Sequence, residues 1–102
     1  MTGQNPQAVL EALARDQHLR GYLHRGRLQI MPAKRSRRLA VLEAVAQVFE
    51  PGIRYPEPAV NELLRAIYLD CATLRRYLVD EQFMDRAESQ YWRIGGSVEP
   101  PN

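Results

Sequence analysis

The chain has 102 residues, which suits one small domain, and its 45% hydrophobic and 25% charged residues are typical of globular proteins. It has no apolar run near the ~20 residues of a membrane span and no signal-peptide pattern at its start. A single cysteine, Cys71, excludes an internal disulfide and a cysteine-based zinc cluster, so we expect a cytoplasmic protein.

The charge is unevenly distributed along the chain. Residues 15–38 contain eight basic residues and one acidic residue, a net of +7, whereas residues 39–102 contain six basic and ten acidic residues, a net of −4. All the basic residues except Lys34 are arginines. This asymmetry favours a polyanionic partner but gives no information about the fold.

The first 30 residues predict two short helical stretches, a turn and a strand. Asn5 and Pro6 are typical of an N-cap and a first helical position, and Asp16 is a candidate cap for the second stretch. The apolar positions of the two stretches are Val9, Leu10 and Leu13, then Leu19, Tyr22 and Leu23. Residues 24–26 predict a turn, and residues 27–30 alternate like a brief strand.

The middle of the chain predicts a long helix over residues 33–49, because Leu42, Val45, Ala46 and Phe49 are spaced i, i+3, i+4 and i+7. Glu50-Pro51-Gly52 ends it. Residues 53–55 predict an edge strand, and Pro58 opens another amphipathic helix.

The last third predicts a helix and a hairpin. Asp70 is the expected cap of a helix that runs to about Glu81 and buries Cys71, Leu74 and Leu78. Residues 83–87 and 90–94 predict two strands joined by a polar turn and closed by Gly95-Gly96. The tail, residues 97–102, is expected to be disordered.

From residue 33 onward, the order helix, strand, helix, helix, hairpin is that of a winged helix. We therefore predict an α+β, mainly helical fold: a winged-helix-like three-helix core with a small antiparallel sheet and an extra N-terminal helical segment. The expected divisions are 1–24 for that segment, 25–95 for the winged-helix-like domain and 96–102 for the tail.

Several sequence blocks carry a resemblance to a known family. They include Gly26-Arg27-Leu28, Phe49-Glu50-Pro51-Gly52 with Tyr55, residues 72–80 and Asp85-Arg86 before Tyr91-Trp92-Arg93. From about Asp16 to Arg93 the chain resembles the bacterial domain-of-unknown-function family 2087. That family occurs alone or appended to helix-turn-helix transcriptional regulators, so the resemblance implies a regulatory setting and transfers no site. Where the family has a capping Ser or Thr, this chain has Pro56, which predicts a shifted helix start.

The helix at residues 70–81 is a candidate recognition helix. With Leu74 and Leu78 inward, Thr73, Arg76 and Asp80 lie on the opposite face, where arginine can read guanine. The alternative is that this face has no binding role, and that Arg75 and Arg76 pair with Asp80 or Glu81 on a solvated surface. We favour the alternative.

The cluster of Lys34, Arg35, Arg37 and Arg38 lies in the first turn of a helix, where the helix dipole disfavours positive charge. Two arrangements can offset this unfavourable interaction with the dipole. One is contact with a polyanion, and the other is a cluster that is solvated or paired within the protein. Arg38 lies along the apolar stripe, so we expect its stem to be buried, whereas Arg37 points outward.

The hairpin places Arg86 and Arg93 beside its turn, as a DNA-binding wing would, but a structural hairpin that covers the core with Trp92 is the favoured interpretation. No catalytic or metal-binding motif surrounds His18 or His24, and we expect Cys71 to be a small buried thiol. We therefore expect no enzyme, no metal and no cofactor.

Together these features predict a DNA-binding domain of transcriptional-regulator type. The expected DNA contacts are Arg27, Lys34, Arg35, Arg37, Thr73, Arg75, Arg76 and Arg86. A homodimer through the apolar residues of 6–23 would bind two half-sites. The alternative is a non-catalytic protein-interaction module that binds an acidic protein partner. Positive charge on the face of the helix at 70–81 favours DNA, and charge on the far side favours the alternative.

Overall fold

The computed structural model describes residues 3–94. The elements in chain order are α1 (Pro6–Arg15), η1 (Arg20–Tyr22), β1 (Leu23–His24), β2 (Arg27–Leu28), α2 (Arg35–Ala46), β3 (Tyr55–Pro56), α3 (Glu57–Arg65), α4 (Cys71–Asp80), β4 (Met84–Ala87) and β5 (Gln90–Arg93). The expected closing glycines Gly95-Gly96 and the tail lie outside the described residues. Among the helices of residues 3–94, none is long and apolar enough to cross a membrane.

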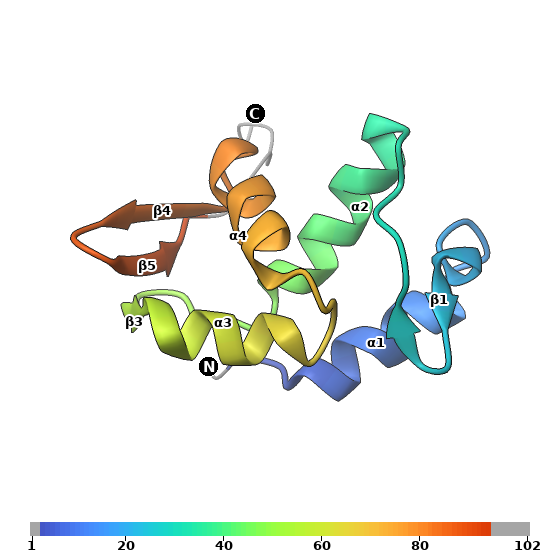
Figure 1. Cartoon of the computed structure of the whole chain (residues 1–102), viewed down its shortest axis with the longest axis horizontal. Coiled ribbons are helices and arrows are strands. Elements are labelled where there is room, and N and C mark those ends of the chain that lie inside the picture. The colour runs from blue at the N-terminus through green and yellow to red at the C-terminus, as the bar shows by residue number, and fades with distance from the viewer. Residues whose placement is uncertain (1–2, 95–102) are drawn as a thin grey trace, which may run out of the picture.

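The elements from α2 onward form the predicted winged-helix arrangement. Helices α2, α3 and α4 enclose the core, and the antiparallel sheet has the order β3-β5-β4 (Figure 1). Tyr55 and Arg86 both oppose Tyr91 in the register, so Tyr91 lies on the central strand. The strand predicted at residues 53–55 thus gives the hairpin its third strand, displaced to residues 55–56. The mainly helical α+β fold is confirmed.

Helix α1 packs against α2 and belongs to the same core. Asn5 caps it as predicted, because its side chain accepts a hydrogen bond of 2.7 Å from the Ala8 N–H. Val9, Leu10 and Leu13 are buried within the chain. The expectation that these apolar residues form a dimer contact is therefore wrong: they cover the helical core of their own molecule instead.

The second predicted helical stretch is confirmed only in part, as a much shorter helix. Asp16 accepts a hydrogen bond from the His18 N–H, two residues on, and only the short 3-10 helix η1 follows. The pairing of the β1–β2 hairpin begins directly after it, where the Tyr22 carbonyl accepts a hydrogen bond from the Gln29 N–H. The expected turn is confirmed as the loop of a β1–β2 hairpin, in which Arg25 and Gly26 have φ of 53° and 79°.

Helix α2 is shorter than predicted at both ends. Its N-cap is Lys34, and it ends at Ala46, three residues before Phe49. Phe49 is nevertheless completely buried, because the turn after the helix directs it into the core, where its ring meets that of Tyr55 edge-on at 5.2 Å. The helical spacing of apolar residues therefore continues beyond the last residue of the helix.

Helix α3 begins at Glu57, so the predicted shift of its start is wrong. Pro56 occupies the N-cap position and has no side-chain cap. A neighbouring element serves the first turn instead, since the Glu57 N–H donates to the Ser89 carbonyl in the β4–β5 turn at 3.0 Å. Pro58 is tolerated because the first turn of a helix requires no N–H from it.

The β4–β5 hairpin, hereafter the wing, agrees closely with the prediction. Glu88 and Ser89 form its two-residue loop with φ of 53° and 64°, values that match the twist of the strands. The buried aromatic residue is Tyr91, which is 1% exposed, rather than Trp92. Trp92 is half-buried on the other side of the strand, under the guanidinium of Arg54 at 4.0 Å. Alternation along β5 decides which ring enters the core.

Candidate nucleic-acid interface

Helix α4 starts with a complete side-chain cap. Asp70 accepts hydrogen bonds from the Thr73 N–H at 3.2 Å and from the Thr73 hydroxyl at 2.7 Å. The hydroxyl bond, followed by the backbone bond, lowers the pKa of Asp70; slight burial opposes this, and Arg76 adds a weaker attraction. Thr73, predicted as a DNA contact, thus has its hydroxyl bound in the cap.

Arg75 lies between α4 and α3. Its Nη1 donates to the side-chain oxygen of Asn61, and its Nη2 lies 3.8 Å from Glu57 Oε2. The predicted alternative, pairing of Arg75 with Asp80 or Glu81, is not the arrangement found. The side chain is 21% exposed, so Arg75 is held in place rather than free in solvent.

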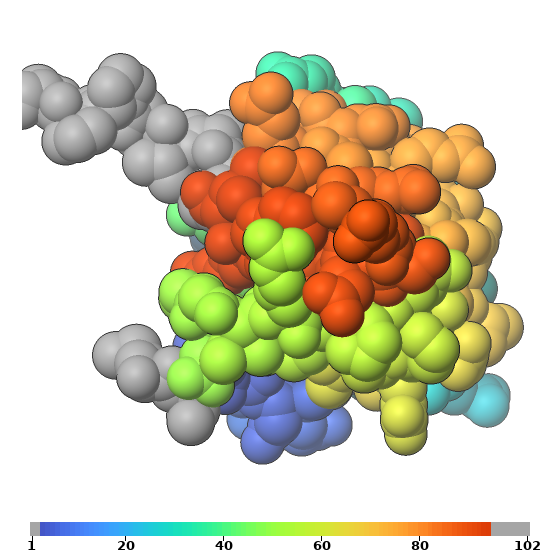
Figure 2. All heavy atoms as spheres, turned by 90° about the vertical axis from the view of Figure 1, so that its left-hand side faces the viewer, coloured from blue at the N-terminus to red at the C-terminus, as the bar shows by residue number. Residues whose placement is uncertain are grey.

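Arg76 and Arg86 are the exposed arginines of this region. Arg76 comes from the outer face of α4 and Arg86 from β4, and neither takes part in an ion pair within residues 3–94. Figure 2 looks onto this end of the molecule, where the wing lies between α4 and the start of α3. The helix and the wing therefore present their cations on neighbouring surfaces.

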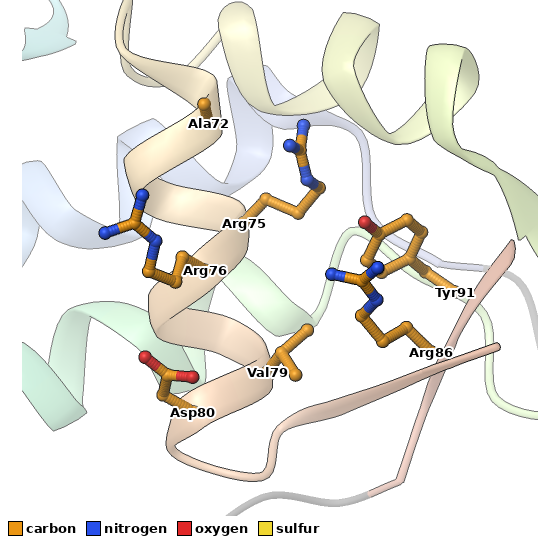
Figure 3. A pocket seen from close by; sticks show the side chains of 7 residues that line it. All are labelled: Ala72, Arg75, Arg76, Val79, Asp80, Arg86 and Tyr91. Atoms are coloured by element: carbon orange, nitrogen blue, oxygen red, sulfur yellow. The ribbon is translucent and has the colours of Figure 1, made fainter. Parts of the chain in front are cut away.

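A pocket of about 270 Å³ separates α4 from the wing. Its lining residues are Ala72, Arg75, Arg76, Val79, Asp80, Arg86 and Tyr91. In Figure 3, Arg75 and Arg86 extend toward the Tyr91 side of the pocket, whereas Arg76 and Asp80 lie along the outer side of α4. Three of the eight predicted DNA contacts are thereby brought together, with one carboxylate beside them.

The cluster at the start of α2 is separate from this pocket and partly paired. Arg35 reaches Glu81, 46 residues later, with its Nη2 at 2.7 Å from Oε1 and its Nε at 3.4 Å from Oε2. Lys34 is exposed, and Arg37 points outward as predicted, toward the Tyr22 hydroxyl at 3.4 Å. An internally paired arginine was one of the two alternatives for this cluster, and Arg35 adopts it.

Arg38 confirms the expectation of a buried stem. Its Nη1 donates to the carbonyls of Pro32 and Ala33 at 3.3 and 3.0 Å, and its guanidinium lies 5.1 Å from the centre of the Tyr77 ring. This side chain closes the loop before α2 onto α4. It acts as part of the packing.

Arg27 lies at the opposite end of the molecule from the wing, on the β1–β2 hairpin (Figure 1). There it lines a hollow of about 310 Å³ between the hairpin and the α3–α4 turn, together with His24, Arg25, Leu28, Gln29, Tyr68 and Leu69. Leu69 is 73% exposed. The predicted arginine face is thus divided between two ends of the molecule.

Two residues that link elements of the fold show no signal in the sequence. Glu57 accepts a hydrogen bond of 2.8 Å from the Tyr91 hydroxyl, and Arg54 covers Trp92. Burial, and to a lesser extent the bond to Glu57, raise the pKa of Tyr91 above its ordinary value. Only the β3–β5 pairing, which no local motif specifies, brings these residues together.

The residues considered for catalysis or metal binding do not assemble into a cluster. Cys71 is half-buried, less than the predicted buried thiol, and its Sγ lies 3.7 Å from an Arg65 nitrogen. His18 and His24 are exposed. Over residues 3–94, no group of three His, Cys, Asp or Glu side chains is arranged to hold a metal ion.

Comparison with known protein families gives a match. The family model described as "Uncharacterized protein conserved in bacteria (DUF2087)" matches residues 27–93, from the second strand of the β1–β2 hairpin to the end of the wing. No curated protein and no solved structure matches the chain. The matched segment contains all three helices and the whole sheet of the winged-helix arrangement, and it covers more than half of the chain. The chain therefore belongs to this bacterial family of uncharacterized proteins, domain-of-unknown-function family 2087.

Proposed function

We propose that this domain is a non-catalytic, cytoplasmic DNA-binding module of transcriptional-regulator type. In this proposal α4 enters or borders a groove of the duplex, and the wing lies on the adjacent backbone. The observation that carries it is the placement of Arg76 and Arg86: both are exposed, lack an ion pair within residues 3–94, and line one pocket between the third helix and the wing.

The surroundings of these arginines limit the size of the interface. Arg75 is partly neutralised by Glu57, and Asp80 lines the same pocket. The proposal therefore rests on two or three phosphate contacts, fewer than the eight predicted DNA contacts. Because each phosphate contact contributes about −0.9 to the log–log salt dependence, we expect a slope of about −2 to −3.

The test is a binding titration by fluorescence anisotropy, with a labelled duplex of mixed sequence at about 50 mM salt and above. We expect Arg76→Ala and Arg86→Ala each to weaken binding and to reduce the salt slope by about one unit. Arg20→Ala is the matched control, because Arg20 is an exposed arginine on η1, away from α4 and the wing. Absence of duplex binding at low salt, or equal losses in the control, would overturn the proposal.

Dimerisation belongs to the same proposal. A module with so few contacts gains affinity when two copies bind two half-sites. Since the apolar residues of α1 are buried, the contact must use another surface. Light scattering of the protein with and without duplex measures this directly, and a monomer in both states would refute it.

A second candidate function is binding of an acidic protein partner at the far end. The observation that favours it is the exposed Leu69 beside Arg25 and Arg27, since an apolar contact rimmed by cations fits an acidic segment with one apolar anchor. The probe is a synthetic acidic peptide, rich in Glu, that carries a single Leu as its anchor. We expect amide NMR shifts at the hollow that Leu69→Glu abolishes. Shifts confined to other surfaces would exclude this function.

A further inference from the structure

The pocket between α4 and the wing holds two guanidinium groups close to one aromatic ring. The guanidinium carbons of Arg75 and Arg86 each lie 5.8 Å from the centre of the Tyr91 ring, although Arg75 comes from α4 and Arg86 from β4. Figure 3 shows the Arg86 guanidinium lying against the ring, whereas the Arg75 guanidinium turns toward α3. Both cations line the same pocket, so an anion placed between them would be attracted by both.

The two arginines differ in how firmly they are held. Arg75 is fixed by Asn61 and Glu57, so little of its conformational freedom remains to be lost when it binds a ligand. Arg86 is exposed and has no ion-pair partner within the described chain. Arg75 is thus a donor already held in position on α4, and Arg86 is an exposed donor on β4. The two can bind the same ligand group from two sides.

The chemistry of the lining indicates the class of ligand. A guanidinium offers a planar fork of N–H donors that matches the oxygens of phosphate. The volume of about 270 Å³ is below the ~300–1,000 Å³ of pockets for drug-sized ligands, which favours a small group over a whole organic molecule. Asp80 on the rim limits how much negative charge the pocket accepts.

We propose that Arg75 and Arg86 form a site for a single phosphate group between α4 and the wing. The phosphate belongs either to the DNA backbone or to a small phosphorylated molecule. Arg76 lies on the rim, within reach of an adjacent charge. This inference deepens the proposed function by naming the group that the α4–wing surface takes, and it can stand without DNA.

The first arm of the test uses the full chain and inorganic phosphate, with chloride at equal ionic strength as the salt control. The readout is the arginine Nε–Hε NMR signals. We expect saturable shifts for Arg75 and Arg86 at millimolar phosphate. Arg86→Ala should weaken binding about tenfold, as for one lost charge-assisted contact, and Arg86→Lys should weaken it less because the charge remains. Arg20→Ala should bind phosphate as the wild type does.

The second arm identifies the source of the phosphate and separates the two proposals. Duplex DNA that shifts the same signals and displaces inorganic phosphate supports a backbone phosphate. Saturable phosphate binding without any duplex binding supports the site and refutes the DNA function. Duplex binding that leaves both signals unmoved refutes the site; the DNA function stands in that case if Arg76→Ala still weakens duplex binding and Arg20→Ala does not. No saturable shift with either probe refutes the site as well.

Discussion

The Tyr91 hydroxyl donates a hydrogen bond of 2.8 Å to Glu57 Oε1, joining the central strand of the sheet, β5, to the first turn of α3. The other oxygen of Glu57 lies 3.8 Å from Arg75 on α4. One carboxylate therefore links three elements of the winged helix. The same link connects Arg75, one side of the proposed phosphate site, to β5 through Glu57.

Tyr91→Phe should lower the free energy of unfolding by about 1 kcal/mol, because it removes a buried hydroxyl bonded to a carboxylate and keeps the ring. Urea denaturation measures the change. Tyr68→Phe is the control, since Tyr68 is half-buried and its hydroxyl makes no side-chain hydrogen bond within residues 3–94. Equal effects of the two substitutions would show that the Glu57 bond contributes nothing.

Stability should fall in alkaline solution through Tyr91. Burial raises the pKa of Tyr91 above its ordinary 10.0, so the folded chain holds this proton more tightly than the unfolded chain does. Its contribution is complete below pH 10 and is lost as the pH rises toward the folded value. Urea midpoints between about pH 9 and about pH 11 should therefore fall more for the wild type than for Tyr91→Phe. Parallel curves would contradict this.

Gly26→Ala should destabilise the chain by about 1 kcal/mol. Gly26 has φ of 79° in the β1–β2 loop, a conformation that strains alanine even though nothing lies within 4 Å of the added methyl group. Gly21→Ala is a matched control, because Gly21 is equally open and has no positive φ. Thermal or urea unfolding should place Gly21→Ala at or slightly above the wild type. The opposite order would contradict the turn assignment.

Arg35→Ala should leave duplex affinity close to that of the wild type, whereas Arg86→Ala should weaken it. The reason is that Glu81 already binds the Arg35 guanidinium through two contacts. Because the Arg35 side chain is 65% exposed, its loss should cost under about 1 kcal/mol of stability. Anisotropy titrations of both variants decide this; a larger loss of affinity in Arg35→Ala would extend the interface to the start of α2.

Asp80→Asn should strengthen binding of both duplex and inorganic phosphate, because it removes the carboxylate that lines the pocket. Glu11→Gln is the control, an exposed carboxylate on α1 outside that pocket. The expected gain is several-fold at low salt and shrinks as salt screens the charge. An unchanged affinity for both ligands would mean that no anion approaches Asp80.

The sequence located features that depend on near neighbours. The Asp70 cap of α4 and the two-residue loop of the wing are both set by residues within a few positions of one another. The turn and second strand of the β1–β2 hairpin were predicted as well, but its first strand, Leu23–His24, was not, because the spacing of Leu19, Tyr22 and Leu23 also fits a helix. The period of apolar residues also carried the predicted end of α2 past its last turn, to Phe49.

The candidate site, like the fold, was predicted only in part. Sequence alone identified Arg75, Arg76 and Arg86 as candidates from their place on a helix and a wing. It could not assign their charge partners: Arg35 meets Glu81 across 46 positions, and Tyr91 meets Glu57 across 34. Such pairs are chosen by the packing of whole elements, which no local pattern encodes.

By itself, then, the amino-acid order determined α1, the succession of elements from α2 onward and the winged-helix class, because periodicity, caps and turns act over short distances. Only the tertiary structure decided which arginines remain free, which aromatic ring enters the core, and that α1 covers its own core rather than a second copy. Those outcomes depend on which surfaces meet when the elements pack, and burial and ion pairing are settled only at that stage.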